Sequence, residues 1–398
     1  MDLARVRLID RLIGGVLCAV LDASRRILGR REESTGSSPK KILFIELSEI
    51  GAAILAEPAL RHVRRSWPEA EIYFWIFAEN ADVLRVQGLV DPEKVFLIRS
   101  RSVWTVMVDA LAGLRRVRRE GIDAVVDLEL FSRITAILSF LTGASQRTGF
   151  DRHEMEGLYR GKLQTRAVLY NPYRHISANF IALVEALKRP ADEAPHLKAP
   201  SAIIETSVPR APGLDSYRDA MSARLSARLP GFDRRKGFIC LHADFESRLP
   251  IRNWPMPRYR ELADRLLALD GVFVAWVGKI RGDGNGTPAH ARSVDLSGET
   301  TLEELLGTLD LATAVVSHDS GVVHLATLTR AAVVALYGPE TPSLYGPLTE
   351  DKTVFYENFA CSPCLSAFNH RTSTCRDNAC VRAIGVDAVF EAVRKRLY

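Results

Sequence analysis

The N-terminal part of the sequence lacks a hydrophobic run long enough to cross a bilayer. Its apolar stretch, Leu12 to Leu21, has ten residues, whereas a membrane-spanning helix needs about 20. The sequence also lacks a large charge of one sign: the formal charge is +5, and residues 1–41 alone hold nine Lys/Arg against five Asp/Glu. Because the rest of the chain is nearly neutral, we expect no nucleic-acid partner, which would need a basic face on the folded domains.

The length and composition are those of an ordinary globular protein. At 398 residues, 47% hydrophobic and 25% charged, the chain suits two α/β domains better than one large core. Strand-like and helical segments alternate from Lys40 onward, and the alternation restarts after a Pro- and charge-rich stretch. This rhythm predicts two Rossmann-like domains with parallel sheets facing a cleft. The expected boundaries are 1–39 for an N-terminal helix and linker, 40–212 for an acceptor-side domain, and 213–398 for a donor-binding domain.

Residues 5–31 predict an amphipathic helix. Leu8, Leu12, Val16 and Val20 recur at i, i+4 spacing, with arginines before and after them. Such a helix lies on an anionic membrane surface, so we expect peripheral attachment at the inner face of the cytoplasmic membrane. Packing of this helix on the protein's own core is the open alternative. A signal peptide is disfavoured because no small-residue cleavage site follows.

The segment Ala314 to Pro347 predicts a strand, a tight turn and a helix. Ligands of doubly wound sheets bind at such turns, after the carboxyl ends of the strands. The first amides of the helix would face the cleft, as in a diphosphate site. Asp319 would accept hydrogen bonds from sugar hydroxyls, with a helix cap as its alternative role. The candidate donor-binding residues are Asp319, Ser320, Gly321, His324, Gly338 and Thr341.

Four segments together resemble glycosyltransferase family 9, the ADP-heptose heptosyltransferases of lipopolysaccharide core assembly. They read FIELSEIGAAILAEPAL, IRNWPMPRYRELADRL, DLSGETTLEELLGTLDLA and HDSGVVHLATLTRAAVVALYGPETPSLYGP, and they follow the family order over most of the chain from Lys40. The resemblance implies a GT-B fold and an inverting transfer without a catalytic metal. It also implies a nucleotide-sugar donor, ADP-heptose, and a lipopolysaccharide or lipid-linked glycan acceptor.

Matching the family's site residues to this sequence, position by position, gives a donor site in which one residue differs from the family. The motif D-S/T-G-x-x-H is intact at Asp319 to His324, which assigns it to the donor. Where relatives have K-x-W-P, with a lysine on the donor phosphates, this chain has Arg252 before Trp254. Arginine keeps the charge and binds phosphate in a bidentate manner. The alternative is an arginine in a surface loop.

The opening turn departs further from the family pattern K-x-S-x-x-G-D. The aligned residues are Glu46, Ser48, Gly51 and Ala52, so the aspartate that serves the family as general base is absent. An inverting transfer still needs a base near the attacking hydroxyl. We therefore assign the base role to Glu49, with Ser48, Gly51 and Asn80 on the acceptor side. The alternatives are a charge favourable to the helix start and a protein that has lost transferase activity.

Four of the six cysteines lie close together near the C-terminus. Cys361, Cys364, Cys375 and Cys380 are spaced C-x2-C-x10-C-x4-C, which is typical of a closed thiolate site for structural zinc or iron. The alternatives are two disulfides, disfavoured in a reducing cytoplasm, and free thiols. Similar clusters occur in some family members, among them protein-modifying autotransporter heptosyltransferases that bind iron.

Two other functions remain open from the sequence. The cysteine cluster favours a protein O-heptosyltransferase of the autotransporter-modifying type, whereas the N-terminal helix speaks against it. The alanine at position 52 favours a non-catalytic relative that binds sugar nucleotides without turning them over.

Overall fold

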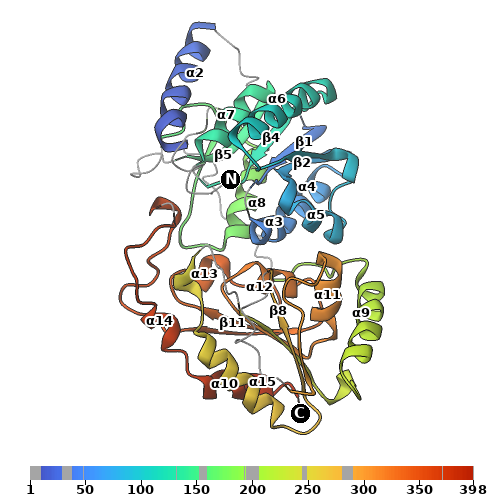
Figure 1. Cartoon of the computed structure of the whole chain (residues 1–398). Helices are drawn as coiled ribbons and strands as arrows, with labels where there is room; N and C mark the ends of the chain where they lie inside the picture. The colour runs from blue at the N-terminus through green and yellow to red at the C-terminus, as the bar shows by residue number, and fades with distance from the viewer. Residues whose placement is uncertain are drawn as a thin grey trace. The chain divides into compact units, whose positions relative to one another are not determined.

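The computed structural model describes residues 10–28, 38–47, 49–130, 132–151, 159–191, 193, 206–243, 249–279, 290–369 and 371–397. The chain divides into two units, Met1–Glu205 and Thr206–Tyr398. Each unit is built around a six-stranded parallel sheet with helices on its faces (Figure 1). The prediction of an α/β fold with two Rossmann-like sheets is therefore confirmed.

The first sheet has the order β3-β2-β1-β4-β5-β6, and all its neighbouring strands are parallel. Its direction of winding reverses between β1 and β4, which makes the carboxyl ends of these two strands the expected place for a ligand. The strands are β1 (Lys41–Ile45), β2 (Glu71–Phe77), β3 (Val95–Ile98), β4 (Ala124–Asp127), β5 (Gln146–Asp151) and β6 (Arg166–Leu169).

Helices α6 and α7 cover one face of this sheet. Leu114 of α6 and Leu138 of α7 share a buried cluster with Trp75 of β2. A Cβ added at Gly113 would lie 2.6 Å from the Trp75 ring, so glycine lets α6 approach the sheet closely. The helices of this unit are η1 (Asp10–Gly14), α2 (Gly15–Leu28), α3 (Ile50–Leu55), α4 (Glu57–Ser66), η2 (Ala78–Asn80), α5 (Asp82–Gln87), η3 (Pro92–Lys94), α6 (Val103–Glu120), α7 (Arg133–Thr142) and α8 (Ile176–Ala186).

The second sheet has the order β12-β11-β10-β7-β8-β9, again all parallel, and its winding reverses between β7 and β10. Its strands are β7 (Phe238–His242), β8 (Phe273–Val277), β9 (Ser293–Asp295), β10 (Ala314–His318), β11 (Ala332–Tyr337) and β12 (Lys352–Tyr356). Its helices are α9 (Leu214–Arg228), η4 (Arg234–Lys236), η5 (Pro250–Arg252), α10 (Met256–Leu267), α11 (Leu302–Leu311), α12 (Gly321–Ala326), α13 (Pro342–Tyr345), η6 (Ala367–Asn369), α14 (Ala379–Arg382) and α15 (Val386–Arg394).

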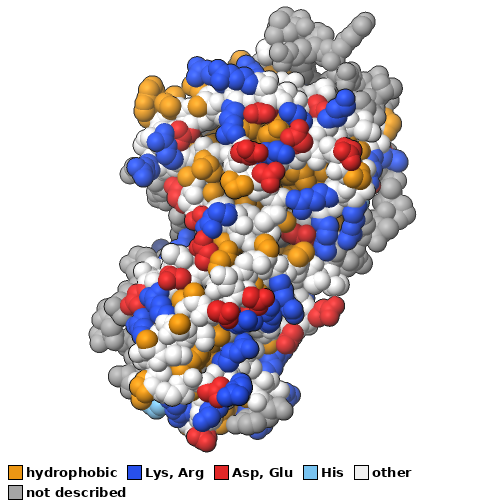
Figure 2. All heavy atoms as spheres, turned by 90° about the vertical axis from the view of Figure 1, so that its right-hand side faces the viewer, with side chains coloured by type: hydrophobic (Ala, Val, Ile, Leu, Met, Phe, Trp, Pro, Cys, Tyr) orange, Lys and Arg blue, Asp and Glu red, His pale blue; other side chains and the backbone are white. Residues whose placement is uncertain are grey.

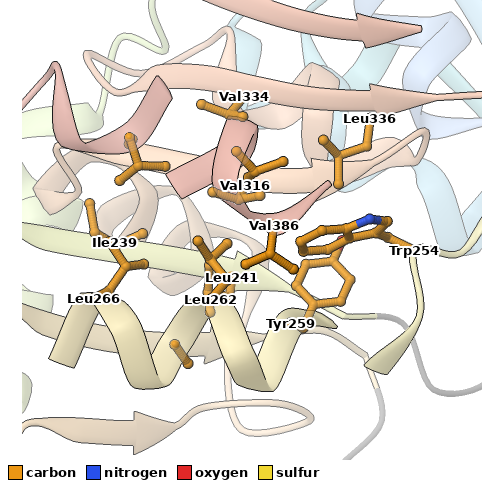
Figure 3. Close-up of a cluster of buried hydrophobic side chains, with 14 of the residues drawn as sticks. Ile239, Leu241, Trp254, Tyr259, Leu262, Leu266, Val316, Val334, Leu336 and Val386 are labelled. Atoms are coloured by element: carbon orange, nitrogen blue, oxygen red, sulfur yellow. The ribbon is translucent and has the colours of Figure 1, made fainter. Parts of the chain in front are cut away.

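The core of the second unit fixes the segment that carries Arg252. Trp254 and Tyr259 pack edge to face, with ring centroids 4.9 Å apart, against the apolar side chains drawn in Figure 3. The Trp254 indole donates a hydrogen bond to the carbonyl of Ile384, 3.0 Å away, in the turn between α14 and α15. The chain is thus anchored immediately after Arg252, which limits the positions that the Arg252 side chain can reach.

The N-terminal helical segment buries one side and exposes the other. Cys18 and Asp22 are buried, and α2 contacts α7. Ile13, Val16 and Val20 are exposed on the opposite side. Within the described ranges, none of the helices combines the length and hydrophobicity needed to cross a membrane.

Candidate functional site

Two buried histidines lie where the second sheet reverses. His242 ends β7 and His318 ends β10, with ring centroids 5.2 Å apart. His242 Nδ1 lies 3.0 Å from the Ser317 hydroxyl and 3.3 Å from the Ser320 hydroxyl. Burial lowers the pKa of His242 to about 4, and burial first, then the neighbouring His242 and Arg252, lower the pKa of His318 well below its ordinary value. Both rings are therefore neutral near pH 7, so they offer hydrogen-bonding atoms but no charge.

Asp319, the residue after His318, forms an ion pair with Arg252. The Asp319 carboxylate lies 3.4 Å from Nε of Arg252, and both side chains are largely buried. The cap of α12 is Ser320, whose hydroxyl accepts a hydrogen bond from the amide of Val322 at 3.2 Å. Asp319 thus serves as an ion-pair partner in place of a helix cap. Arg252, whose side chain is largely buried, does not lie in a solvated surface loop.

Glu340 ties a second arginine to this pair. Its carboxylate, 3% exposed, lies 2.8 Å from Nη2 of Arg252 and 3.2 Å from Nε of Arg371. The Arg371 guanidinium also covers the ring of Tyr345, 4.9 Å from its centroid. Two arginines and two carboxylates therefore form one buried network with balanced formal charge, and each guanidinium is held in a fixed orientation.

Four members of this site were not predicted from the sequence: His242, His318, Glu340 and Arg371. His318 directly precedes the predicted DSG turn. His242 stands opposite Ser317 in the register of β7 and β10, so the histidine at the end of the strand GFICLH was a usable signal. Glu340 lies inside the motif GPET, where its charge could have been noticed. Arg371 lies inside the cysteine-rich segment, between Cys364 and Cys375 and far along the chain from Arg252, and its sequence context gave no signal.

The remaining donor-site candidates have local roles. His324 is buried in α12, and Gly321 is the first residue of that short helix. The Thr341 hydroxyl accepts from the Ser343 amide at 3.3 Å and caps α13. At Gly338, an added Cβ would lie 2.5 Å from Val381 and 2.8 Å from the sulfur of Cys380. Gly338 is thus required by the close packing of α14 against the end of β11.

Changing Gly338 to Ala is expected to lower the free energy of unfolding by about 1–3 kcal/mol, because the added methyl overpacks the contact with α14. Chemical denaturation measures this change. The matched control is Gly15→Ala, where an added Cβ meets only one atom at an ordinary 3.7 Å. If the Gly338 variant keeps its stability but loses nucleotide affinity, the glycine serves the ligand and not the packing.

The four cysteines do not form a metal site in the structure. Among the described residues, no group of three or more His, Cys, Asp or Glu side chains could hold a metal ion. Cys380 is buried in α14, whereas Cys375 is exposed and its thiol donates to the Asp377 carbonyl at 2.8 Å. Cys361 and Cys364 are also free thiols. The described residues therefore give no support to the predicted metal site, and none of the four cysteines forms a disulfide in the structure. His370 lies outside the described residues.

The turn after β1 presents Glu49 at the reversal point of the first sheet. Glu49 occupies the N-cap position of α3, yet its side chain makes no capping hydrogen bond. Its amide donates to the buried carboxylate of Glu46 at 3.3 Å. Glu49 itself is half-buried, as are Gly51 and Ala52. Ser48 lies outside the described residues.

Two further side chains brace this turn. The Glu129 carboxylate accepts from the amide of Leu47 at 3.0 Å, and the Asn80 amide donates to the Leu47 carbonyl at 3.2 Å. Asp127, at the end of β4, is fully buried and paired with Arg160. Asn80 therefore shapes the backbone of the turn, and Asp127 is too enclosed to receive a proton from a substrate. Glu49 is the more accessible carboxylate.

Two units that each contain a doubly wound parallel sheet are the architecture of the GT-B class, and comparison with known proteins identifies the family. A family model described as glycosyltransferase family 9 (heptosyltransferase) matches residues 111–373. Lipooligosaccharide heptosyltransferase 2 of Haemophilus influenzae is 30% identical over 159 residues, 36% of this chain and 45% of that protein. The chain thus matches less than half the length of this relative. It belongs to glycosyltransferase family 9.

Solved structures share the fold over nearly the whole chain. The ADP-heptose lipopolysaccharide heptosyltransferase II of E. coli superposes with a TM-score of 0.65 and 20% identity, covering 90% of this chain and 98% of that one. The E. coli heptosyltransferase WaaC with ADP gives a TM-score of 0.63 and 18% identity, covering 89% and 99%. The predicted GT-B fold is confirmed by these neighbours.

Proposed function

We propose that the protein is an inverting, metal-independent heptosyltransferase. It moves a heptosyl residue from a nucleotide-diphosphate donor, ADP-heptose, to a lipopolysaccharide or lipid-linked glycan acceptor. Membership of family 9 supports the reaction class, and the structure of WaaC with ADP supports the nucleotide. The observation that carries the proposal is Arg252, held by Asp319 and Glu340 beside the reversal point of the second sheet.

Arg252 stabilises the departing diphosphate. A guanidinium presents five N–H donors in one plane, so it can hold carboxylates and still bind a phosphate oxygen. Its side chain is only 15% exposed, and charge interactions are stronger in such partly dry surroundings than in water. The two neutral histidines add hydrogen-bonding groups without charge. Asp319 orients the sugar through its hydroxyls.

Glu49 takes the proton of the acceptor hydroxyl. It stands at the carboxyl end of β1, where ligands of such sheets bind, and its side chain is not used as a helix cap. As the hydroxyl attacks the anomeric carbon, its oxygen forms the new glycosidic bond, the bond to the diphosphate breaks, and the proton passes to the Glu49 carboxylate. Displacement from the opposite face inverts the anomeric centre.

We place the protein in the cytoplasm, attached peripherally to the inner face of the membrane through residues 5–31. The exposed apolar side of η1 and α2 supports this attachment. The acceptor is then within reach, since lipid-linked glycans are anchored in that membrane.

Thermal unfolding in the presence of nucleotides tests the donor. A ligand that binds the native state at 100 times its Kd adds about 2.7 kcal/mol, which should raise Tm by roughly 5 °C or more for units of this size. We expect this shift with ADP and ADP-heptose and a smaller one with UDP and GDP. A selective shift with UDP or GDP would overturn the donor assignment, and no shift with any of them would favour a protein without transferase activity.

A further inference from the structure

Helix α6 carries an exposed row of large apolar side chains. Trp104 is 70% exposed and Leu111 is 52% exposed, and Val103, Met107 and Val108 are exposed beside them. Positions 104, 107, 108 and 111 follow the i, i+3, i+4, i+7 spacing that places residues on one side of a helix. These five residues, the α6 apolar row, form a continuous stripe on the outer side of the helix.

The inner side of α6 is apolar as well. Leu114 and Val117 are buried in the core of the first unit, and Val106 and Ala110 pack against it. A helix that is apolar on both sides is ordinarily buried on both sides. Burial in the unit's own core explains the inner side only, so the outer side requires a partner.

Exposed apolar side chains are concentrated on two helical segments of the first unit. In the part of the chain that the structure describes, thirteen large hydrophobic side chains are exposed; five form the α6 apolar row and four lie on η1 and α2. Both α2 and α6 contact α7 (Figure 1). The face drawn in Figure 2 carries Lys/Arg, Asp/Glu and hydrophobic side chains interspersed with one another. This clustering of exposed apolar side chains on two helical segments indicates an interaction surface.

The charges around α6 identify the partner. Residues 99–120 contain six arginines against two acidic residues. Arg99 is paired with Asp109 at 2.7 Å, but Arg101, Arg115 and Arg119 are exposed at the two ends of the apolar row. An apolar row flanked by arginines matches the boundary between acyl chains and anionic headgroups. A second copy of the chain would bring two sets of arginines together, which is unfavourable.

We propose that α6 inserts its apolar row into an anionic lipid bilayer and is a second membrane contact beside residues 5–31. The helix lies in the plane of the interface, with Trp104 and Leu111 among the upper acyl segments and the arginines at the headgroups. The proposal rests on the first unit alone and holds whichever sugar the second unit binds.

Trp104 reports on this contact directly. Of the five tryptophans, Trp75, Trp254 and Trp276 are buried, Trp67 is half-buried, and Trp104 is 70% exposed. We would mix the full-length protein with vesicles of phosphatidylglycerol and phosphatidylcholine whose acyl chains carry bromine, a short-range fluorescence quencher. The expected result is a blue shift and strong quenching, both weaker with phosphatidylcholine alone. Trp104→Phe should still bind the vesicles but lose most of the quenching.

Substitutions separate α6 from other contacts. The double variant Trp104→Ser, Leu111→Ser should weaken vesicle binding by about tenfold or more, since it removes two large apolar groups from the interface. The matched control is Tyr173→Ser, an exposed aromatic residue of the same unit away from α6. Nucleotide-induced stabilisation should be unchanged in all variants, which keeps this test independent of the transferase assignment.

Two outcomes would overturn the proposal. Vesicle binding without quenching of Trp104 would mean that residues 5–31 attach the protein and α6 stays in water. A blue shift of Trp104 that rises with protein concentration in the absence of lipid would mean that a second copy of the chain covers the apolar row.

Discussion

Replacing Glu49 by Gln should lower kcat by about 10²–10⁴-fold, because the acceptor hydroxyl then loses its base. The glutamine keeps the size of the side chain and the N-cap backbone of α3, where Glu49 makes no capping bond. Nucleotide-induced stabilisation should therefore be unchanged. Steady-state transfer assays with ADP-heptose measure kcat, and thermal unfolding with ADP measures the binding.

A rescue experiment makes this test specific. By its resemblance to the family motif, Ala52 corresponds to the family's aspartate, and it is half-buried near the same turn. Adding Ala52→Asp to the Glu49→Gln variant should restore a large part of kcat, since a carboxylate returns to the family's place. Full activity in Glu49→Gln alone would show that Glu49 is not the base and that its charge serves the start of α3.

Replacing Arg252 by Gln should have the largest combined effect. The loss of a preorganised cation at the leaving group is expected to lower kcat/KM by about 10²–10³-fold or more. Stability should also fall by about 3–5 kcal/mol, because Asp319 and Glu340 lose a buried partner. Transfer kinetics and chemical denaturation measure the two effects separately.

Two companion variants tell catalysis from structure. Arg252→Lys restores the family's own residue and the charge, so activity should stay within about tenfold of the natural protein. Adding Asp319→Asn to Arg252→Gln removes the carboxylate whose ion-pair partner is lost, whereas Glu340 keeps Arg371, and should recover stability but not kcat/KM. An Arg252→Gln variant that is folded and fully active would contradict the assigned role.

Local patterns were sufficient to predict the fold. Apolar strand segments such as ILFI and VVAL, separated by helical segments, lie as parallel strands buried in the two sheets. The sequence DSG after a strand also predicted the strand, turn and short helix found at Asp319. These features depend on residues close together in the chain, where hydrophobic periodicity and turn chemistry act.

Contacts between distant residues could not be predicted in the same way. Glu340 joins Arg252 to Arg371 although the three residues come from separate segments of the chain, after β11, β7 and β12 respectively. The cysteine spacing suggested a metal site, but among the described residues no group of three or more possible ligands is arranged to hold a metal ion. The exposure of the outer side of α6 could not be predicted, because a helical pattern in the sequence does not show which sides of the helix the rest of the protein buries.

The most direct test of heptosyl transfer uses the purified full-length protein, ADP-heptose and a lipopolysaccharide acceptor that lacks core heptose. Mass spectrometry of the acceptor should show the addition of one heptosyl residue, together with release of ADP, and both should be lost in Glu49→Gln. Binding of ADP-heptose without any modified acceptor, while a known family member modifies the same acceptor in parallel, would contradict the proposed function.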